Sequence, residues 1–281
     1  MVTLSGNSGC SLEIITENRQ SYVKKVSASK SYDERLLKQC MKQKDCSKLI
    51  GKSPLYNIVK IPSITFNNNN SFTMELFHGK DSISYFMECD IHSIDHFIDN
   101  VIKFVELEIE NCTYSLFDPK VVTDKVYSVA SRINGKSVID PDRIVTYVES
   151  LPIINIPHGT CHGDLTLSNM LIGRDGQVCI IDFLDTFYET PIQDMVKIRQ
   201  DTLYKWSSIV YNKNYDSTRY NMLMEYLDNS FDKFFSKFEY YKLYYNVFQL
   251  VNYYRILPYS KTKKIRDHVE ANLQEIFQKC T

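Results

Sequence analysis

Three polar side chains in one part of the chain have the chemistry to handle a phosphorylated nucleotide. Asp164 and Asn169 lie five positions apart, and Asp182 follows two apolar runs that flank the turn residues 174–176. The Asp-Gly pair in this turn predicts a β-hairpin, which returns the chain so that Asp182 arrives beside the other two side chains. Phosphoryl transfer needs a carboxylate to accept the hydroxyl proton and oxygen ligands that hold Mg²⁺ on the nucleotide. These residue types at this spacing therefore predict Mg²⁺-dependent phosphoryl transfer.

The order of residue types around these positions resembles a known family. The pattern H-G-D-x-x-x-x-N over residues 162–169, followed by I-D-F at 181–183, resembles the catalytic signature of the aminoglycoside phosphotransferase and choline kinase family. Its members are small-molecule kinases with a protein-kinase-like fold. The resemblance implies that Asp164 is the catalytic base and that Asn169 and Asp182 are the Mg²⁺ ligands. The alternative is that the stretch is a capped turn without chemistry.

Further residues are expected to support this site. The resemblance implies that His162 is structural and that Asp194, at an expected helix start after a proline, braces the catalytic loop. Asp185 stands at a position that varies in the family, where it could bind either the water of a second metal ion or the substrate. Protein kinases carry arginine at the position of Gly163 and glycine at that of Leu184. The sequence therefore favours a small-molecule kinase over a protein kinase.

The N-terminal third is expected to bind the nucleotide, ATP or GTP. Gly6, Ser8 and Gly9 lie in a loop between predicted strands, where glycine lets backbone N–H groups approach phosphates closely. A plain hairpin turn would have the same composition. The segment M-E-L-F-H-G, which contains Glu75 and Phe77, resembles the family's hinge, whose backbone pairs with the adenine.

Two adjacent lysines compete for the role of the phosphate-binding lysine. A strand directs neighbouring side chains to opposite faces, so only one of Lys24 and Lys25 can reach the nucleotide. The family pattern places a small apolar residue over the adenine two positions before this lysine, and Val23 stands in that relation to Lys25. Glu34, nine residues after Lys25, is the implied ionic partner, at a shorter interval than in most relatives. Lys24 is then expected on a solvated face.

Local patterns predict the elements that must position these residues. β-prone runs at 12–15 and 22–26 predict a hairpin, and a second pair of strands is expected at 58–66 and 72–77, on either side of four asparagines. Residues 32–48, rich in leucine, lysine and glutamine, predict a helix between the two pairs. The N-terminal part is therefore expected to be mostly strands.

The pattern beyond residue 80 is helical. Apolar residues spaced by three and four positions over 94–109 predict one helix. Asp140 directly before Pro141 predicts the start of another. About four helical segments are expected after Pro191, with Pro258 as the clearest break.

These elements and the resemblance together predict an α+β, bilobal protein-kinase-like fold. Residues 1–79 are expected to form a small, β-rich, nucleotide-binding N-terminal lobe. Residues 80–281 are expected to form a larger helical C-terminal lobe, which carries catalysis and acceptor binding.

Composition excludes several other classes of protein. Apolar residues make up 43% of the chain, and 33 Lys or Arg nearly balance 34 Asp or Glu, so neither nucleic acid nor an anionic membrane is an expected partner. Eight cysteines without a Cys-x-x-Cys pair indicate free thiols in a reducing compartment. Because no 18-residue apolar window and no signal-peptide pattern occur, we expect a cytoplasmic protein that does not insert into a membrane.

The acceptor is expected to be a neutral or anionic hydroxyl compound, with sugars and their derivatives favoured. Residues 191–281, where the family builds its acceptor site, carry 14 Lys or Arg against 10 Asp or Glu, whereas a polycationic aminoglycoside benefits from carboxylates. Residues 183–201 resemble phosphotransferase-like proteins of bacterial surface-polysaccharide pathways. The alternatives are an aminoglycoside (antibiotic) phosphotransferase and a nucleotide-binding pseudokinase scaffold without turnover.

Overall fold

The chain divides into two compact units, each built from two separate segments. The computed structural model describes residues 2–4, 10–133 and 137–280. The first unit comprises Met1–Phe104 with His162–Asp185, and the second comprises Val105–Cys161 with Thr186–Thr281. The stretch with the phosphotransferase-like signature thus folds together with the N-terminal strands. The expected boundary between an N-terminal lobe of residues 1–79 and a C-terminal lobe of residues 80–281 stays a prediction.

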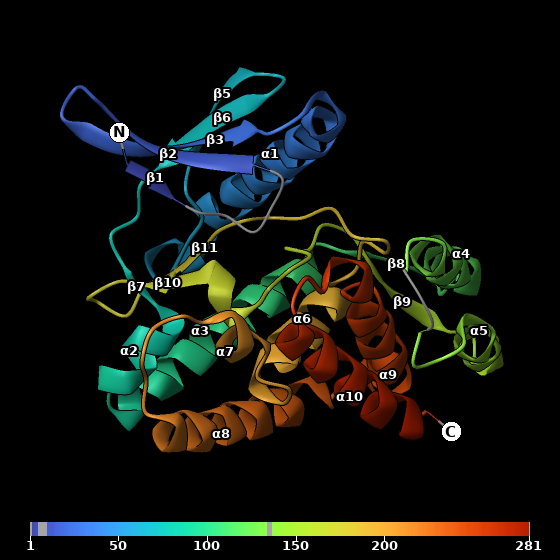
Figure 1. Ribbon diagram of the computed structural model, residues 1–281. Helices are drawn as coiled ribbons and strands as arrows, with labels where there is room; N and C mark the ends of the chain where they lie inside the picture. Colours follow the sequence, from blue (N-terminus) through green and yellow to red (C-terminus); the bar gives the residue numbers. More distant parts are fainter. Residues whose placement is uncertain (1, 5–9, 134–136, 281) are drawn as a thin grey trace. The chain divides into compact units, whose positions relative to one another are not determined.

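A five-stranded antiparallel sheet forms the N-terminal part of the first unit (Figure 1). Its strand order is β1 (Val2–Leu4), β2 (Cys10–Glu17), β3 (Gln20–Ser27), β6 (Ser71–Glu75) and β5 (Ile64–Asn68). The first predicted hairpin is β2–β3, and its two turn residues, Asn18 and Arg19, have φ angles of 50° and 64°. Two left-handed residues in a two-residue loop match the right-handed twist of the flanking strands. The turn therefore sets the register of β3.

One helix, α1 (Lys30–Gly51), packs against this sheet through contacts with β3, β5 and β6 (Figure 1). Its inward side chains Leu36 and Cys40 join Val23, Phe72 and Met74 of the strands in one core. Their spacing is the one by which an amphipathic helix buries a single face. The helix predicted over residues 32–48 is confirmed, and it extends slightly beyond both of the predicted ends.

A second, four-stranded sheet belongs to the same unit. Its strand order is β4 (Val59–Lys60), β11 (Val178–Ile180), β10 (Met170–Ile172) and β7 (Lys80–Asp81). The predicted Asp-Gly hairpin is β10–β11, with Gly176 at φ +80° in its turn. The strand expected over 58–66 is divided, because β4 pairs with β11 whereas β5 pairs with β6. Pro62 lies between the two parts, and it has no N–H to continue a ladder.

Helices dominate the rest of the chain. The α-helices are α2 (Ser82–Glu88), α3 (Ile91–Glu110), α4 (Pro119–Ala130), α5 (Pro141–Ser150), α6 (Pro191–Thr202), α7 (Trp206–Val210), α8 (Ser217–Phe235), α9 (Glu239–Tyr254) and α10 (Lys263–Gln278). A hairpin pairs β8 (Thr113–Leu116) with β9 (Asn155–His158), and the 3-10 helices are Pro54–Asn57, Leu167–Asn169 and Leu257–Tyr259. The carboxylate of Asp140 caps α5 by accepting a hydrogen bond from the N–H of Asp142 (3.1 Å), as its place before a proline predicts.

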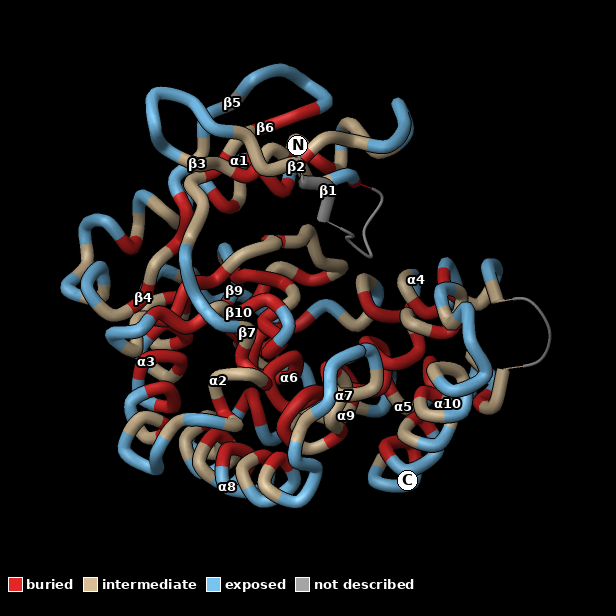
Figure 2. Tube along the Cα trace, turned by 60° about the vertical axis from the view of Figure 1, so that its left-hand side comes forward, coloured by how far each residue is buried: buried red, intermediate tan, exposed pale blue. Residues whose placement is uncertain are grey.

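Helix α6 lies at the centre of the second unit. Every residue of this helix is buried, and it packs against α8 and α9 (Figure 2). Arg199 of α6 donates hydrogen bonds to both carboxylate oxygens of Asp228 on α8, at 2.9 and 2.7 Å. The interior position of this arginine is therefore compensated by a paired carboxylate.

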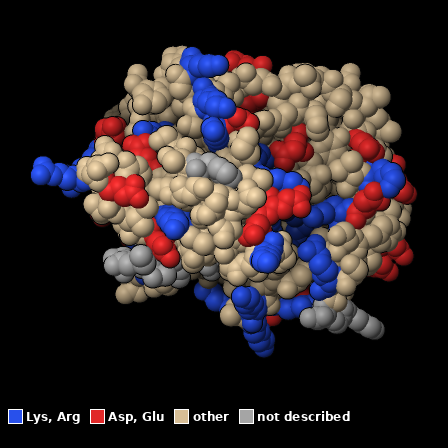
Figure 3. All heavy atoms as spheres, turned by 90° about the horizontal axis from the view of Figure 1, so that it is seen from above, with Lys and Arg blue, Asp and Glu red and all other residues tan. Residues whose placement is uncertain are grey.

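Positive and negative side chains are interspersed on the surface seen in Figure 3. A nucleic-acid-binding face would instead gather lysine and arginine in one region. In the described part of the chain, no helix combines the length and the apolar character needed to cross a bilayer.

Candidate active site

His162 joins two segments that carry the polar residues of the site. Its buried ring accepts a hydrogen bond at Nδ1 from the N–H of Asp164 (3.1 Å) and contacts the carbonyl of Ile181 through Nε2 (2.9 Å). Because a carbonyl can only accept, Nε2 carries the proton and Nδ1 is the acceptor of a neutral ring. The N–H of Leu184 donates in turn to the His162 carbonyl (3.0 Å). His162 therefore holds the segment after β11 against the 162–169 loop.

Two residues of the site have a left-handed backbone. Gly163 has φ +89°, a conformation that side chains disfavour, and this gives a physical reason for glycine at this position. Asp182 has φ +65° although it is not glycine, which costs on the order of 1 kcal/mol. Such conformations persist where the surrounding contacts determine them, and they are concentrated at functional sites.

The side-chain amide of Asn169 orients Asp164. Its Nδ2 donates to the carbonyl oxygen of Asp164 (2.8 Å) and to the carboxylate Oδ2 (3.0 Å). Because the amide hydrogens face Asp164, the amide Oδ1 is the atom that Asn169 presents as an acceptor elsewhere. The carbonyl of Asn169 also accepts from the N–H of Ile181 (3.0 Å). This backbone bond brings Asn169 beside the residue that precedes Asp182.

Lys25 of β3 forms an ion pair with Asp182. Only 4% of Lys25 is exposed, and Val23 lies on the same buried face of β3. Lys24 lies on the opposite face of the strand and is less buried. The alternation of the strand thus places Lys25 and Val23 together, as the sequence predicts. The Lys25 ammonium also donates to Oε1 of Gln39 on α1 (3.1 Å).

The ion pair expected between Lys25 and Glu34 is wrong. Glu34 is exposed and pairs with Lys38 one turn later on α1 (2.8 Å), and the hydrogen bond from Lys38 lowers the pKa of the Glu34 carboxyl. The inward face of α1 carries Leu36 and Gln39, and the helical repeat turns Glu34 away from this face. Sequence reasoning missed Gln39 because it searched for a carboxylate. The available signal was a polar residue three positions after an inward leucine.

The Asp185 side chain pairs with a residue of α1. Its carboxylate lies 3.3 Å from the guanidinium Nε of Arg35, and both side chains are more than a third exposed. Lys42, two turns further along α1, donates to the carbonyl of Leu184 (2.7 Å). Helix α1 therefore anchors the segment that follows Asp182 at two points. A substrate or metal role for Asp185 stays a prediction.

The expected hinge follows β6. The carboxylate of Glu75 pairs with Lys60 (3.0 Å). At Gly79 a Cβ atom would lie 2.7 Å from the ring of Phe77 and 2.9 Å from the carbonyl oxygen of Ile172. The close approach of these groups therefore requires glycine. The pairing of the backbone at Glu75 and Phe77 with adenine stays a prediction.

The remaining predicted residues fall elsewhere. Gly6, Ser8 and Gly9 lie outside the described residues. Asp194 is fully buried in the first turn of α6, and Thr190 caps this helix by accepting from the N–H of Ile192 (3.3 Å). The bracing role of Asp194 stays a prediction.

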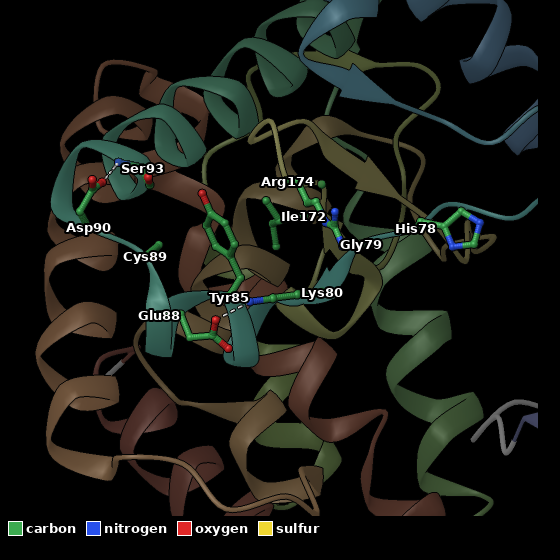
Figure 4. Close-up of a pocket in the computed structure, with 11 residues that line it drawn as sticks. His78, Gly79, Lys80, Tyr85, Glu88, Cys89, Asp90, Ser93, Ile172 and Arg174 are labelled. Atoms are coloured by element: carbon green, nitrogen blue, oxygen red, sulfur yellow. Dashed lines mark hydrogen bonds and ion pairs between the residues drawn. The ribbon is translucent and has the colours of Figure 1, made fainter.

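A separate pocket of about 650 Å³ lies in the first unit (Figure 4). It is lined by His78, Gly79, Lys80, Tyr85, Glu88, Cys89, Asp90, Ser93, Ile172, Gly173 and Arg174. Lys80 and Glu88 form an ion pair there, and the carboxylate of Asp90 accepts from the N–H of Ser93 (2.8 Å). Part of the pocket's charge is thus neutralised within the protein. Lys25, Asp164, Asn169 and Asp182 are not among the residues that line it.

The fold is protein-kinase-like, and it is shared with several small-molecule phosphotransferases. Ethanolamine kinase from Plasmodium vivax matches with a TM-score of 0.58 and 11% identity, over 100% of this chain and 83% of that chain. An aminoglycoside phosphotransferase in a ternary complex with ADP and hygromycin B matches with a TM-score of 0.60 and 11% identity, over 99% of this chain and 92% of that chain. Choline kinase from Streptococcus pneumoniae matches with a TM-score of 0.53 and 12% identity, over 99% of this chain and 91% of that chain. The predicted α+β, kinase-like fold, with a β-rich N-terminal part and a helical C-terminal part, is thus confirmed.

Part of the chain also matches a family of known proteins in sequence. Residues 139–219 match the phosphotransferase enzyme family, and this span includes the whole H-G-D-x-x-x-x-N and I-D-F signature. No curated protein matches the chain in sequence. Over these residues the match agrees with the family resemblance and with the prediction of a phosphotransferase.

Proposed function

We propose that this protein transfers the γ-phosphoryl group of ATP or GTP to a hydroxyl group of a sugar or sugar-like small molecule, with Mg²⁺. The observation that carries the proposal is the arrangement of two side-chain pairs in the first unit, in which Asn169 orients Asp164 and Lys25 contacts Asp182. Together these groups offer a carboxylate for a proton, oxygen ligands for a metal ion and an ammonium for phosphates. Similar folds have been solved with ATP, ADP or AMP-PNP, which supports the nucleotide.

Asp164 acts as the general base in this proposal. The hydrogen bond from Asn169 to Oδ2 (3.0 Å) fixes the rotation of the carboxylate. The acceptor hydroxyl gives its proton to this carboxylate while its oxygen bonds to the γ-phosphorus. The bond from that phosphorus to the β,γ-bridging oxygen breaks, and ADP or GDP leaves with that oxygen. A positioned base contributes roughly 10²- to 10⁴-fold to such a rate.

The donor atoms of Asn169 and Asp182 fit a Mg²⁺ ion. This ion takes carboxylate and amide oxygens, and it keeps several ligands for water and phosphate. Asn169 presents its Oδ1 because Nδ2 is engaged by Asp164, and Asp182 supplies the carboxylate. When bound, Mg²⁺ neutralises charge on the phosphates of the nucleotide.

Lys25 exchanges partners when the nucleotide binds. A buried ammonium needs an anionic or strongly polar partner, and Asp182 provides one in this structure. Phosphate oxygens would offer the same compensation to Lys25, and the Asp182 carboxylate would then be available to Mg²⁺. The pair is thus pre-arranged for the two charges of a metal-bound nucleotide.

The charge of the C-terminal helices favours a neutral or anionic acceptor. Ethanolamine, choline and aminoglycosides, after which the similar structures are named, all carry cationic nitrogen. Residues 191–281 of this chain carry 14 Lys or Arg against 10 Asp or Glu, and an excess of positive charge disfavours a cationic ligand. Sugars and their phosphorylated or nucleotide-linked forms therefore come first.

The test is a panel of acceptors with Mg-ATP and with Mg-GTP. The panel contains free sugars, sugar phosphates, nucleotide sugars, ethanolamine, choline and kanamycin, and the readouts are acceptor-dependent ADP or GDP release and the mass of the product. We expect the highest kcat/KM for a member of the sugar group. A higher value for kanamycin would overturn the acceptor class but leave the phosphotransferase in place. Nucleotide binding without any product would favour a scaffold.

A further inference from the structure

The ammonium of Lys25 has a second, uncharged partner in addition to Asp182. Gln39 accepts a hydrogen bond from Lys25 Nζ at Oε1 (3.1 Å), and only 1% of Gln39 is exposed. Fourteen positions separate the two residues, so the contact depends on the packing of α1 against β3. Both of these groups are buried where water cannot replace a lost hydrogen bond.

The orientation of the Gln39 amide follows from its two neighbours. An ammonium group can only donate, so the amide must turn its oxygen toward Lys25. This leaves Nε2 to donate to the hydroxyl oxygen of Tyr32 (3.1 Å), which lies about two turns earlier in α1. The hydrogen bonds therefore run in one direction, with Lys25 donating to Gln39 and Gln39 donating to Tyr32. Each member fixes the next, and the ammonium is held from the helix side.

We propose that Gln39 positions the Lys25 ammonium for the phosphates of the nucleotide, in place of the acidic residue that the sequence suggested at this point. The inference rests on the proposed function, since it concerns how that site binds its nucleotide. It identifies a positioning residue, because Gln39 acts through Lys25 and does not itself touch the reacting atoms.

A neutral partner has a consequence for charge. A carboxylate at this position would pair with Lys25 and compete with the phosphates for its ammonium. Gln39 supplies the directional acceptor without a negative charge, so the positive charge of Lys25 is shared with Asp182 alone among the described side chains within hydrogen-bond distance. When phosphates take over the contact with Lys25, Gln39 keeps its hydrogen bond and the ammonium stays in place.

The experiment compares three variants, Gln39→Leu, Gln39→Glu and Gln43→Leu. Gln43 is the matched control, because it is also buried on the inward face of α1 but donates to the carbonyl of Pro62 (3.1 Å) and not to the lysine. Each variant is purified, its melting temperature is measured, and AMP-PNP affinity is determined by calorimetry beside kcat and KM for Mg-ATP.

We expect Gln39→Leu to weaken AMP-PNP binding and raise the KM for Mg-ATP by roughly tenfold, the effect of losing a hydrogen bond to a charged group. Gln43→Leu should lower the melting temperature about as much as Gln39→Leu does, while it shifts the KM for Mg-ATP by less than about twofold. Gln39→Glu should recover part of the loss in kcat/KM but stay below wild type, since it restores an acceptor whose charge competes with the phosphates for Lys25.

Equal nucleotide constants for Gln39→Leu and Gln43→Leu would overturn the role of Gln39, as would a Gln39→Glu variant no better than Gln39→Leu. Failure of the proposed function has a different signature. In that case the wild-type protein itself binds no AMP-PNP and releases no ADP.

Discussion

Lys25 and Asp182 form an ion pair although 157 positions separate them in the chain. Lys25 lies on β3 of the five-stranded sheet, and Asp182 follows β11 of the four-stranded sheet. The lysine side chain is 5% exposed and the aspartate side chain 34%. The pair thus connects the expected nucleotide-binding strands to the 162–182 region within a single compact unit, and it leaves the carboxylate accessible to a ligand.

Replacing Asp182 by alanine should strongly reduce metal-dependent turnover. The change removes the carboxylate that is proposed to hold Mg²⁺ on the phosphates, and electrostatic contributions of this kind are worth about 10²- to 10³-fold in kcat. Steady-state ADP release with Mg-ATP measures the effect. Asp175→Ala is the control, because the Asp175 carboxylate accepts from the N–H of Gln177 in the β10–β11 turn (3.1 Å). Turnover by Asp182→Ala near the wild-type rate would rule out the assignment.

Asp164→Ala should slow the chemical step while sparing the nucleotide. Removal of a general base lowers kcat by roughly 10² to 10⁴, whereas AMP-PNP affinity should stay within a few-fold of wild type. Calorimetry and single-turnover kinetics separate the two effects. If affinity and rate fell together, the loss would instead indicate a collapsed 162–169 loop, since Asn169 donates to both the backbone and the side chain of Asp164.

Lys25→Ala should raise the KM for nucleotide much more than Lys24→Ala. The two residues occupy opposite faces of β3, and Lys25 is the one that contacts Asp182. Because both changes remove one positive charge from the same strand, their difference reports on position alone. The reverse order of effects would mean that the strand register differs by one residue.

Local signals explain which elements were predictable. The β2–β3 turn and the Asp-Gly turn of β10–β11 need only two or three residues to determine their shape, and both hairpins form as predicted. The division of residues 58–66 between two sheets was not predictable in this way. It depends on β4 pairing with β11, more than a hundred positions away in the chain.

The partner of Lys25 shows the same limit at the level of the site. The family pattern directed attention to a carboxylate, and Glu34 on the predicted helix was the candidate. Burial of a polar amide at Gln39 depends on which face of α1 the sheet covers, and Asp182 supplies the charge from another part of the chain. A search for polar residues on the apolar stripe of α1 would have found Gln39.

Stability should depend on the buried ion pair of α6 and α8. Arg199→Leu removes the cationic partner of the Asp228 carboxylate, whose side chain is 12% exposed, and breaking such a pair costs about 3–5 kcal/mol. Thermal denaturation should show a clear fall in melting temperature. The comparison variant is Lys120→Ala, whose ion pair with Asp124 is exposed and should contribute little. Equal melting temperatures of the two variants would contradict the role assigned to Arg199.

The most direct test of the central claim follows the γ-phosphoryl group itself. Protein is incubated with γ-labelled ATP, Mg²⁺ and the pooled sugar acceptors, and label is measured in nucleotide, free phosphate and small-molecule product, for wild type, Asp164→Ala and Asp182→Ala. We predict label in a small-molecule product for wild type, with EDTA abolishing the transfer and both variants reduced by at least about 10²-fold. Transfer that survives EDTA, or that proceeds equally well in both variants, would contradict a Mg²⁺-dependent kinase built on Asp164 and Asp182.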